Sequence, residues 1–259
     1  MRNRLGATFI MERYSDIGDS GEFSWTQNSK HLLVFVHGFG HTAPNKEPVY
    51  WDPLPKLLGS EEKVSEYDIQ YFTYASNKKI LFNPLNLVRG YKEIADYNDI
   101  SDRLISNITQ LSRKKNYSSI NIIAHSFGCH IALVAAAEAK RTSKFFVNKL
   151  CLIAAPNKAP WQARFHYYAS FRRHKHTKTL SNSKELTFNI KNRVSELRSE
   201  EPCTFVTHIF SEHDDLVVDD KSLQFDHKIR LYQPHTWHRT ISGAQDENYR
   251  LIRDWIIGN

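Results

Sequence analysis

The sequence predicts an α/β protein built around a mostly parallel β-sheet, and its hydrophobic pattern carries that prediction. Short apolar runs indicate six strands, at residues 31–37, 67–74, 119–125, 149–155, 204–210 and 228–233. Several runs are continuous rather than alternating, which is typical of strands covered on both faces, as in a parallel sheet. Helical patterns lie between the runs, and strands that alternate with helices define the α/β class.

The elements follow in chain order. The start of the chain, with apolar residues at 7–14 and 22–25, could supply an extra hairpin at the edge of the sheet. Helices are expected at 99–114, at 127–140 and near the C-terminus, because apolar residues recur there at helical spacing. Each helix connects or follows predicted strands, as a parallel sheet requires.

Length and composition favour a single globular domain over residues 1–259. The chain has 259 residues, of which 41% are hydrophobic and 24% charged, and this excludes a disordered or fibrous protein. No apolar run approaches the roughly 18 to 20 residues of a membrane-spanning helix, and the basic start leads into no signal-peptide core. We therefore expect a cytoplasmic protein.

Three cysteines, Cys129, Cys151 and Cys203, are an odd number at wide spacing, each in or beside an apolar run. This pattern predicts buried thiols in a reducing compartment rather than a disulfide framework or a zinc site. His208 and His213 have acidic neighbours, but no second set of ligands accompanies them. We expect no metal ion.

The most informative stretch is the strand at 119–125, which runs with no spacer into a helix. A strand followed directly by a helix forces a sharp turn, so the residue at the apex, Ser126, is strained and projects above the sheet. Small residues are needed two positions before and after it, and Ala124 and Gly128 supply them. Ser126 is therefore the predicted nucleophile, with the backbone nitrogen of Phe127 as a donor to an oxyanion.

This A-H-S-F-G stretch resembles the nucleophile elbow of the α/β-hydrolase superfamily, which is usually G-x-S-x-G. Many lipase-like members carry alanine at the first position, since alanine is still small. The resemblance implies the α/β-hydrolase fold, with helices on both faces of the sheet, and an esterase-like or lipase-like serine hydrolase. The alternative is a structural serine that caps a helix.

The turn after the first core strand, His37-Gly38-Phe39-Gly40, resembles the H-G-x-G turn of the same superfamily. There a backbone nitrogen completes the oxyanion hole, and the resemblance gives that role to Phe39. The same residues fit a relaxed dinucleotide fingerprint, Gly38-x-Gly40-x-x-Ala43, but such a turn opens directly into a helix and an acidic residue follows about 20 positions on. Prolines crowd the next stretch instead, so we expect no cofactor.

The resemblance also implies the chain order serine, acid, histidine. Asp214 precedes Val217 by three positions, the spacing of the superfamily's acid turn, with Asp215 or a plain solvated loop as alternatives. His238 is the base that the resemblance favours, because H-R-T-I precedes a final helix, and His235 is the other choice. The acid would hold the imidazole in its productive tautomer.

Residues 157–202 differ in composition from their surroundings and predict a basic, aromatic cap. Ten lysines and arginines against two glutamates give residues 158–198 a balance of +8, which leaves −1 for the rest of a chain whose total is +7. The apolar residues that mark a second helix of this cap are Leu186, Ile190, Val194 and Leu197. The resemblance places a cap at this point, between the strands at 149–155 and 204–210.

The functional interpretation of the cap is a lid whose aromatic residues line an acyl pocket and whose cations meet an anionic head group or membrane surface. The alternative is that its aromatic residues pack and its charges are solvated. No recognised nucleic-acid-binding module accompanies the charge, so nucleic acid is not the expected partner.

Together these residues predict hydrolysis of a small-molecule or lipid carboxylic ester by Ser126, Asp214 and His238 through an acyl-enzyme. A second interpretation is a non-catalytic binding module on the same fold, although such proteins usually lose a member of the triad and all three occur here. A third is an acyltransferase or thioesterase that uses the same residues.

Overall fold

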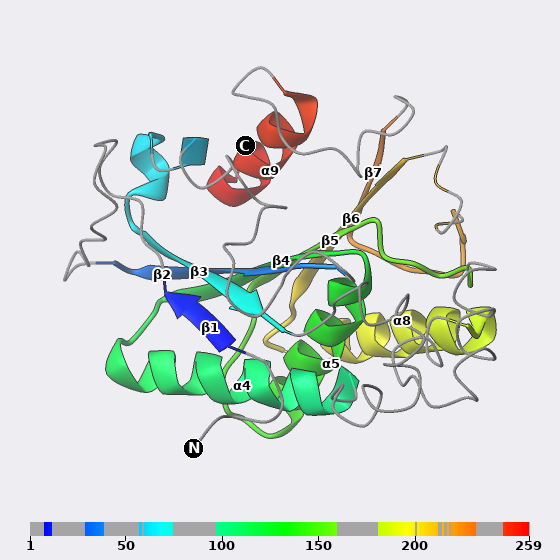
Figure 1. The fold of residues 1–259 in the computed structure, drawn as a ribbon, viewed down its shortest axis with the longest axis horizontal. Helices are drawn as coiled ribbons and strands as arrows, with labels where there is room; N and C mark the ends of the chain where they lie inside the picture. Colours follow the sequence, from blue (N-terminus) through cyan, green and yellow to red (C-terminus); the bar gives the residue numbers. More distant parts are fainter. Residues whose placement is uncertain are drawn as a thin grey trace, which may run out of the picture.

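A seven-stranded sheet forms the centre of the computed structural model, which describes residues 8–11, 29–38, 57–58, 60–74, 97–159, 181–199, 201–211, 214, 217, 219–231 and 246–258. The strands lie in the order β1-β3-β2-β4-β5-β6-β7 (Figure 1). Their bounds are β1 Thr8–Met11, β2 His31–Val36, β3 Tyr67–Thr73, β4 Ser119–His125, β5 Lys149–Ile153, β6 Phe205–Ser211 and β7 His227–Leu231.

The six predicted strands are confirmed, with ends shifted by up to two residues, and all of them, β2 to β7, pair in parallel. The additional strand, β1, pairs antiparallel with β3 at the edge of the sheet. The start of the chain therefore contributes an edge strand, whereas residues 22–25 lie outside the described residues. Because β2 to β7 are parallel, their carboxyl ends all lie on the same side of the sheet. We call this side the carboxyl edge, and the side where these strands begin the amino edge.

Helices cover both faces of the sheet, as the resemblance implies (Figure 1). The described helices are α4 (Tyr97–Lys114), α5 (Phe127–Arg141), α8 (Ser183–Arg198), α9 (Glu247–Ile257) and the short 3-10 helix η1 (Glu62–Val64). The first three lie on one face, where α5 packs between α4 and α8. On the other face, α9 packs beside η1. Within the described ranges, none of these helices has the length and apolar character needed to cross a membrane.

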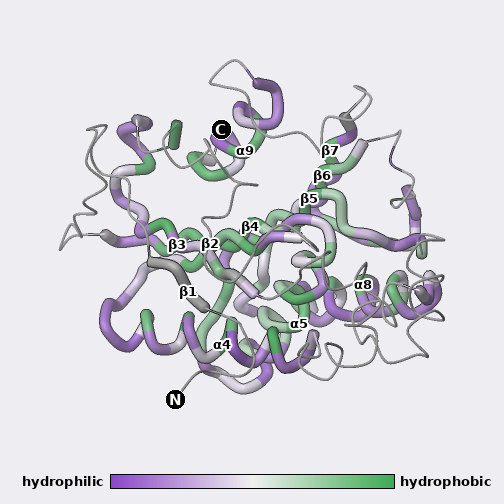
Figure 2. The backbone as a smooth tube through the Cα atoms, in the orientation of Figure 1, coloured by the Kyte–Doolittle hydropathy of each residue, from purple (hydrophilic) through white to green (hydrophobic). Residues whose placement is uncertain are grey.

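The continuous apolar runs are explained by burial on both faces. In β2, Leu32 and Val34 belong to the core under α4, α5 and α8, whereas Leu33 and Phe35 belong to the core under α9. All four side chains are fully buried. The tube in Figure 2 is correspondingly hydrophobic along the central strands, and α4 alternates between hydrophobic and hydrophilic residues.

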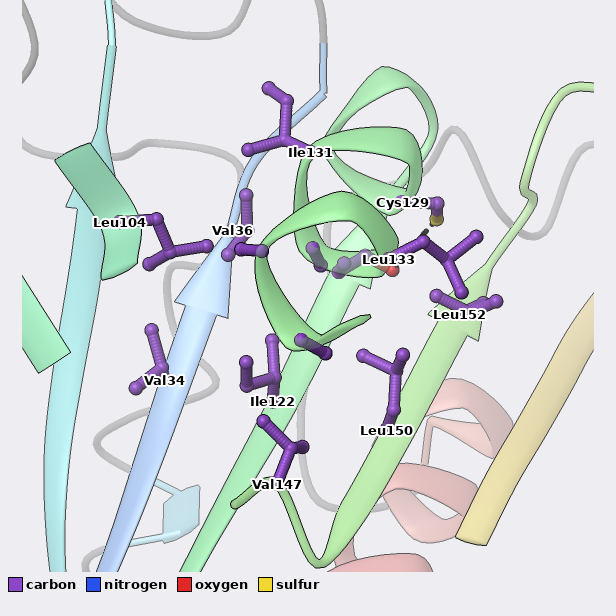
Figure 3. Packing of buried hydrophobic residues seen from close by; sticks show 14 of the residues in the cluster. Val34, Val36, Leu104, Ile122, Cys129, Ile131, Leu133, Val147, Leu150 and Leu152 are labelled. Carbon is purple, nitrogen blue, oxygen red and sulfur yellow. Dashed lines mark hydrogen bonds between the residues drawn. The ribbon is translucent and has the colours of Figure 1, made fainter. Parts of the chain in front are cut away.

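The position of α5 over the middle of the sheet depends on close side-chain packing. Its residue Leu133 lies over Ile122 of β4 and Leu152 of β5, with Val36 of β2 alongside (Figure 3). Burial of each such side chain contributes about 1.5 to 3 kcal/mol to folding. This packing fixes the start of α5 at the carboxyl edge of the sheet.

The second helix predicted within the cap is α8, and its four apolar residues are buried in the core that it shares with α5. The side chain of Asn182 caps its first turn by accepting a hydrogen bond from the nitrogen of Glu185 at 3.3 Å. Residues 160–180 lie outside the described residues, so the assignment of 157–202 as a cap stays a prediction.

Two of the three cysteine predictions agree with the structure and one is wrong. Cys129 and Cys151 are buried free thiols, but Cys203 is exposed. Cys203 lies in the connection from α8 to β6, where its Sγ donates to the carbonyl of Arg198 at 3.2 Å. Burial begins only at the next residue, Thr204, so a neighbouring apolar run was a misleading signal.

Candidate active site

Ser126 occupies a sharp turn between β4 and α5. Its backbone has φ 50° and ψ −125°, between a strand that ends at His125 and a helix that begins at Phe127. A positive φ in a residue other than glycine costs about 1 to 3 kcal/mol and persists only where its surroundings hold it. Here the nitrogen of Ser126 donates to the carbonyl of Ile153 at the end of β5, at 2.8 Å. The strained turn that the sequence predicts is therefore present.

The hydroxyl of Ser126 is not used to cap α5. The residue stands at the N-cap position, yet its side chain makes no capping hydrogen bond. A structural capping role, the alternative considered from the sequence, therefore does not explain this serine. Its side chain is half-buried at the first turn of α5.

Glycines allow the two turns identified in the sequence to meet. A Cβ on Gly128 would lie 2.4 Å from the carbonyl oxygen of His37, so α5 begins directly against the end of β2. A Cβ on Gly38 would lie 2.8 Å from the Cβ of Ser126 and 2.9 Å from Nδ1 of His125. Because no side chain separates them, the turn after β2 stands directly beside the turn that carries Ser126.

Asp214 lies just beyond the carboxyl end of β6 and is buried, with 6% of its surface exposed. Its nitrogen donates to the carbonyl of Ser211 at 3.2 Å, and Val217, three positions on, is also buried. Because it is buried, Asp214 does not lie in a plain solvated loop, which was one of the alternatives. Only β5 separates β6 from β4, so with strands about 4.8 Å apart the two strand ends lie roughly 10 Å from each other.

The structure thus brings Gly38, Ser126 and Phe127 together and places Asp214 at the same edge of the sheet. Both histidines considered as the base, His238 and His235, lie outside the described residues, as do Phe39 and Asp215. Their roles stay predictions. The strand that precedes the two histidines, β7, pairs in parallel with β6 and so ends at the same edge as the others.

Three described histidines near this edge, His37, His125 and His130, are buried. His37 and His130 are 0% and 2% exposed. The Nε2 atom of His130 lies 2.9 Å from the carbonyl oxygen of Pro156, and burial lowers the pKa of this imidazole to about 4. His130 is therefore neutral at pH 7. Sequence reasoning did not identify its contact with Pro156, because apolar patterns give no signal for a pairing between a helix and a distant loop.

A fourth buried imidazole lies within the sheet. His208 of β6 packs against Phe225 at 4.7 Å between ring centroids, and burial, with a smaller contribution from Lys228, lowers its pKa to about 3. Within the described part of the chain, no group of three or more His, Cys, Asp or Glu side chains is placed to hold a metal ion.

Comparison with known proteins adds one sequence relative. No family model matches the chain. A stretch of 106 residues is 26% identical to kynurenine formamidase of Saccharomyces cerevisiae, and it covers 40% of this chain and 34% of that protein. The match thus spans about a third of the length of this curated relative.

Solved structures resemble the chain over nearly its whole length. A lipase-esterase related protein from Clostridium acetobutylicum has a TM-score of 0.58 at 13% identity, covering 98% of this chain and 99% of that one. For a peroxisomal α/β-hydrolase from Saccharomyces cerevisiae the TM-score is 0.56 at 14% identity, covering 100% and 91%. A monoacylglycerol lipase from Paleococcus ferrophilus gives 0.54 at 13% identity, covering 98% of both chains. With its parallel sheet and its strained serine turn, the chain therefore has the α/β-hydrolase fold.

Proposed function

We propose that the protein is a serine hydrolase that cleaves a carboxylic ester through Ser126, His238 and Asp214. The observation that carries this proposal is the turn at Ser126, which holds a strained backbone and leaves the hydroxyl outside the helix cap. Strained backbone conformations are concentrated at active sites, and this one would hold a nucleophile above the sheet. The fold relatives, which include lipases and esterases, support the same class of reaction.

The proposed reaction has two steps, formation of an acyl-enzyme and its hydrolysis. His238 takes the proton of the Ser126 hydroxyl as Oγ attacks the ester carbonyl, and the backbone nitrogens of Phe39 and Phe127 donate to the oxyanion. Collapse of this intermediate expels the alcohol, which receives the proton from His238. Water, deprotonated by His238, then releases the acyl group, while Asp214 holds the imidazole in its tautomer.

The test of the proposal is covalent labelling by a fluorophosphonate probe. We expect the wild type to react, and Ser126→Ala and His238→Ala to lose the reaction. His235→Ala is the matched control and should still be labelled. A wild-type protein that neither reacts nor hydrolyses p-nitrophenyl esters would favour the non-catalytic binding module instead. Transfer of the acyl group to an added alcohol or thiol, in preference to water, would assign an acyltransferase.

A second candidate reaction is favoured by the sequence relative. Kynurenine formamidase is named for hydrolysis of a formamide, and its matched stretch is 26% identical to this chain. Amide and ester hydrolysis can use the same nucleophile, base and oxyanion donors. Comparing an N-formyl aryl amide with a formate ester of the matching phenol separates the two. A higher kcat/KM for the amide would assign the formamidase reaction.

The proposal includes a cap over residues 157–202 that meets an anionic lipid surface. Phe188 of α8 is 63% exposed, and Lys184 and Lys191 lie one turn away on either side. The hydroxyl of Thr187 donates to the carbonyl of Asn157 at 3.1 Å, which holds this part of α8 near the carboxyl end of β5. An aromatic side chain flanked by lysines is a composition suited to a membrane interface. We further propose a cytoplasmic location, which the buried free thiols of Cys129 and Cys151 support.

A further inference from the structure

Lys158 lies in the connection that leaves the carboxyl end of β5, close to the turn that carries Ser126. The carbonyl of Ile153, the last residue of β5, accepts a hydrogen bond from the nitrogen of Ser126 at 2.8 Å. Further along the connection, the carbonyl oxygen of Pro156 lies 2.9 Å from Nε2 of His130. On α5, His130 follows Ser126 by about 6 Å, or one turn, along the helix axis. The connection is therefore anchored about one helical turn from the proposed nucleophile.

Both peptide groups to which Lys158 belongs are held by hydroxyl groups of α8. In the peptide before it, the carbonyl of Asn157 accepts from the hydroxyl of Thr187 at 3.1 Å. In the peptide after it, the nitrogen of Ala159 donates to the hydroxyl of Ser183 at 2.8 Å. Each peptide is planar, so fixing both of them leaves the backbone of Lys158 little freedom to rotate. The Cα of this lysine is thus held in place by α8.

The side chain of Lys158 is exposed although its neighbours are buried. Asn157 and Ala159 are 5% and 9% exposed, and both belong to the segment that α8 holds. A fixed backbone between two buried residues therefore presents one long cationic side chain to solvent. It does so at the carboxyl edge, where Ser126 also lies.

The charge of Lys158 is not neutralised within the part of the chain that the structure describes, where no carboxylate forms an ion pair with it. The acid in the first turn of α8, Glu185, instead accepts from the side-chain amide of Asn182 at 3.4 Å. At the amino edge, by contrast, Nζ of Lys115 is paired with Asp68 at 2.7 Å. An anionic group that reached Lys158 would therefore meet a cation with no competing partner among the described residues.

We infer that the ester substrate carries an anionic group, a carboxylate or a phosphate, and that Lys158 binds it. The inference rests on the proposed function, because it names the substrate class of that same site. Lys158 contacts the substrate away from the reacting carbonyl, so its contact is the same before and in the transition state and acts on KM rather than on kcat. A cation whose backbone is fixed in advance loses less conformational freedom on binding.

The test compares two esters of the same length. One is the 4-nitrophenyl monoester of adipic acid, whose acyl chain ends in a carboxylate, and the other is 4-nitrophenyl hexanoate, whose chain ends in a methyl group. We expect Lys158→Gln to lower the ratio of kcat/KM for the anionic ester to kcat/KM for the neutral ester by about threefold to fivefold, through KM, as for one exposed charge pair. Lys158→Arg keeps the charge and should keep the ratio within about twofold of wild type.

A second pair of esters places the anion on the alcohol side. These are 4-acetoxybenzoate and its neutral methyl ester, which share the same acyl group. A fall of the anionic-to-neutral ratio in Lys158→Gln with either pair supports the inference and identifies the side of the ester that Lys158 contacts. Unchanged ratios with both pairs would overturn it.

Lys184→Gln is the matched control. Lys184 is exposed on α8 next to Ser183, but it lies on the same exposed stripe as Phe188 and holds no part of the connection. The variant removes the same charge from the same region, so both ratios should change by much less than in Lys158→Gln. An equal fall in the two variants would overturn the inference, because the charge of the whole region, rather than Lys158, would then account for selectivity.

These reactions are run without lipid, so they test an anionic group on the substrate itself. An effect of Lys158→Gln that appears only after phosphatidylglycerol vesicles are added would assign the cation to a lipid surface and overturn the inference. A wild type with no Ser126-dependent hydrolysis of any of these esters contradicts the proposed function itself. Ser126-dependent hydrolysis whose ratios are unchanged in Lys158→Gln contradicts the inference alone.

Discussion

Polar side chains are buried at both the amino edge and the carboxyl edge of the sheet, but their hydrogen bonding differs. At the amino edge, the carboxylate of Asp68 is 1% exposed and accepts hydrogen bonds from Nζ of Lys115 and the hydroxyl of Tyr117, both at 2.7 Å. Both hydrogen bonds go to Oδ2 of Asp68. At the carboxyl edge, the Ser126 hydroxyl makes no capping bond and Asp214 is buried beside a loop. The hydroxyl of Ser126, which the helix cap does not use, is the group at this edge that we propose for chemistry.

Three described residues other than glycine have a positive φ, and two of them lie at the carboxyl edge. Ser126 and Ala154, with φ values of 50° and 52°, both lie at the carboxyl ends of strands. The close approach of Gly128 to the end of β2 is found at the same edge. The third residue with a positive φ, Ser143 at 53°, lies in the connection from α5 to β5. Ligands of open α/β sheets bind outside the carboxyl ends of their strands, so the strain at Ser126 and Ala154 lies on the side where a ligand would bind. We expect substitutions at one edge to leave the other edge unchanged.

The largest effect is expected at Ser126, the proposed nucleophile. Ser126→Ala should lower kcat for ester hydrolysis by about 10⁴-fold or more, because the residues of a catalytic triad act as a unit. Loss of a capping serine normally costs about 1 kcal/mol. Here the hydroxyl caps nothing, so the free energy of unfolding, measured in urea, should change by less than about 0.5 kcal/mol. An unchanged hydrolytic rate would remove Ser126 from the mechanism.

Gly128→Ala should damage the carboxyl edge as a structure. The added methyl group would meet the carbonyl oxygens of His37 at 2.4 Å and Val36 at 2.8 Å, which are backbone atoms and cannot rotate away. We expect a loss of at least about 3 kcal/mol in the free energy of unfolding, the upper range for overpacking. Gly258→Ala is the control, since its φ of 77° imposes strain but its nearest neighbour is a flexible lysine side chain. Equal free energies of unfolding for Gly128→Ala and Gly258→Ala would mean that Gly128 is not tightly packed against the end of β2.

The sequence was sufficient to predict most of the fold because burial leaves a local pattern. Continuous apolar runs mark strands covered on both faces, and the absence of a spacer after β4 predicts the strained turn at Ser126. The partner of β1 could not be predicted, since a four-residue edge strand carries little pattern and pairs with β3 across more than fifty positions. The hydrogen bonds between His37 and Tyr74 depend on β2 lying beside β3, which apolar runs do not specify.

His130→Gln should make the protein less sensitive to acid. Its imidazole has a pKa of about 4 when folded and about 6.5 when unfolded. Between these values the unfolded chain binds more protons, so stability falls as pH drops from 6.5 toward 4. Glutamine can keep a donor at the position of Nε2, facing the carbonyl of Pro156, and does not titrate. From pH 7.5 to 4.5 we expect urea unfolding of the variant to lose about 2 kcal/mol less than wild type.

His208 gives the wild type a second contribution of the same sign, because its pKa is lowered to about 3. The His130→Gln variant should therefore keep part of the acid sensitivity. Identical pH profiles for wild type and variant would mean that His130 is protonated in the folded protein or accessible to water.

Lys115→Met should affect the amino edge alone. The change leaves the carboxylate of Asp68 buried with the hydroxyl of Tyr117 still bound. Breaking a fully buried pair costs about 3 to 5 kcal/mol, but the lysine side chain is 21% exposed, so about 1 to 2 kcal/mol is expected. The value of kcat per folded molecule should match wild type. A lowered kcat at full folding would show that the two edges are coupled.

The smallest effect on stability is expected from two phenylalanines that are exposed in the described part of the chain, one near each edge. Phe188 is 63% exposed on α8, at the end of the molecule that carries the serine turn, and Phe205 is 43% exposed at the amino end of β6. Replacing either by serine should change the free energy of unfolding by less than about 0.5 kcal/mol, since neither side chain fills the core.

If the cap meets an anionic surface, only Phe188→Ser should weaken binding to phosphatidylglycerol vesicles. We expect a loss of about threefold to tenfold, because the contact with the vesicle loses part of one aromatic ring. Binding would be measured by vesicle sedimentation. If Phe188→Ser and Phe205→Ser weaken vesicle binding equally, binding does not depend on the edge at which the aromatic side chain lies, and the proposed lipid-facing role of α8 is wrong.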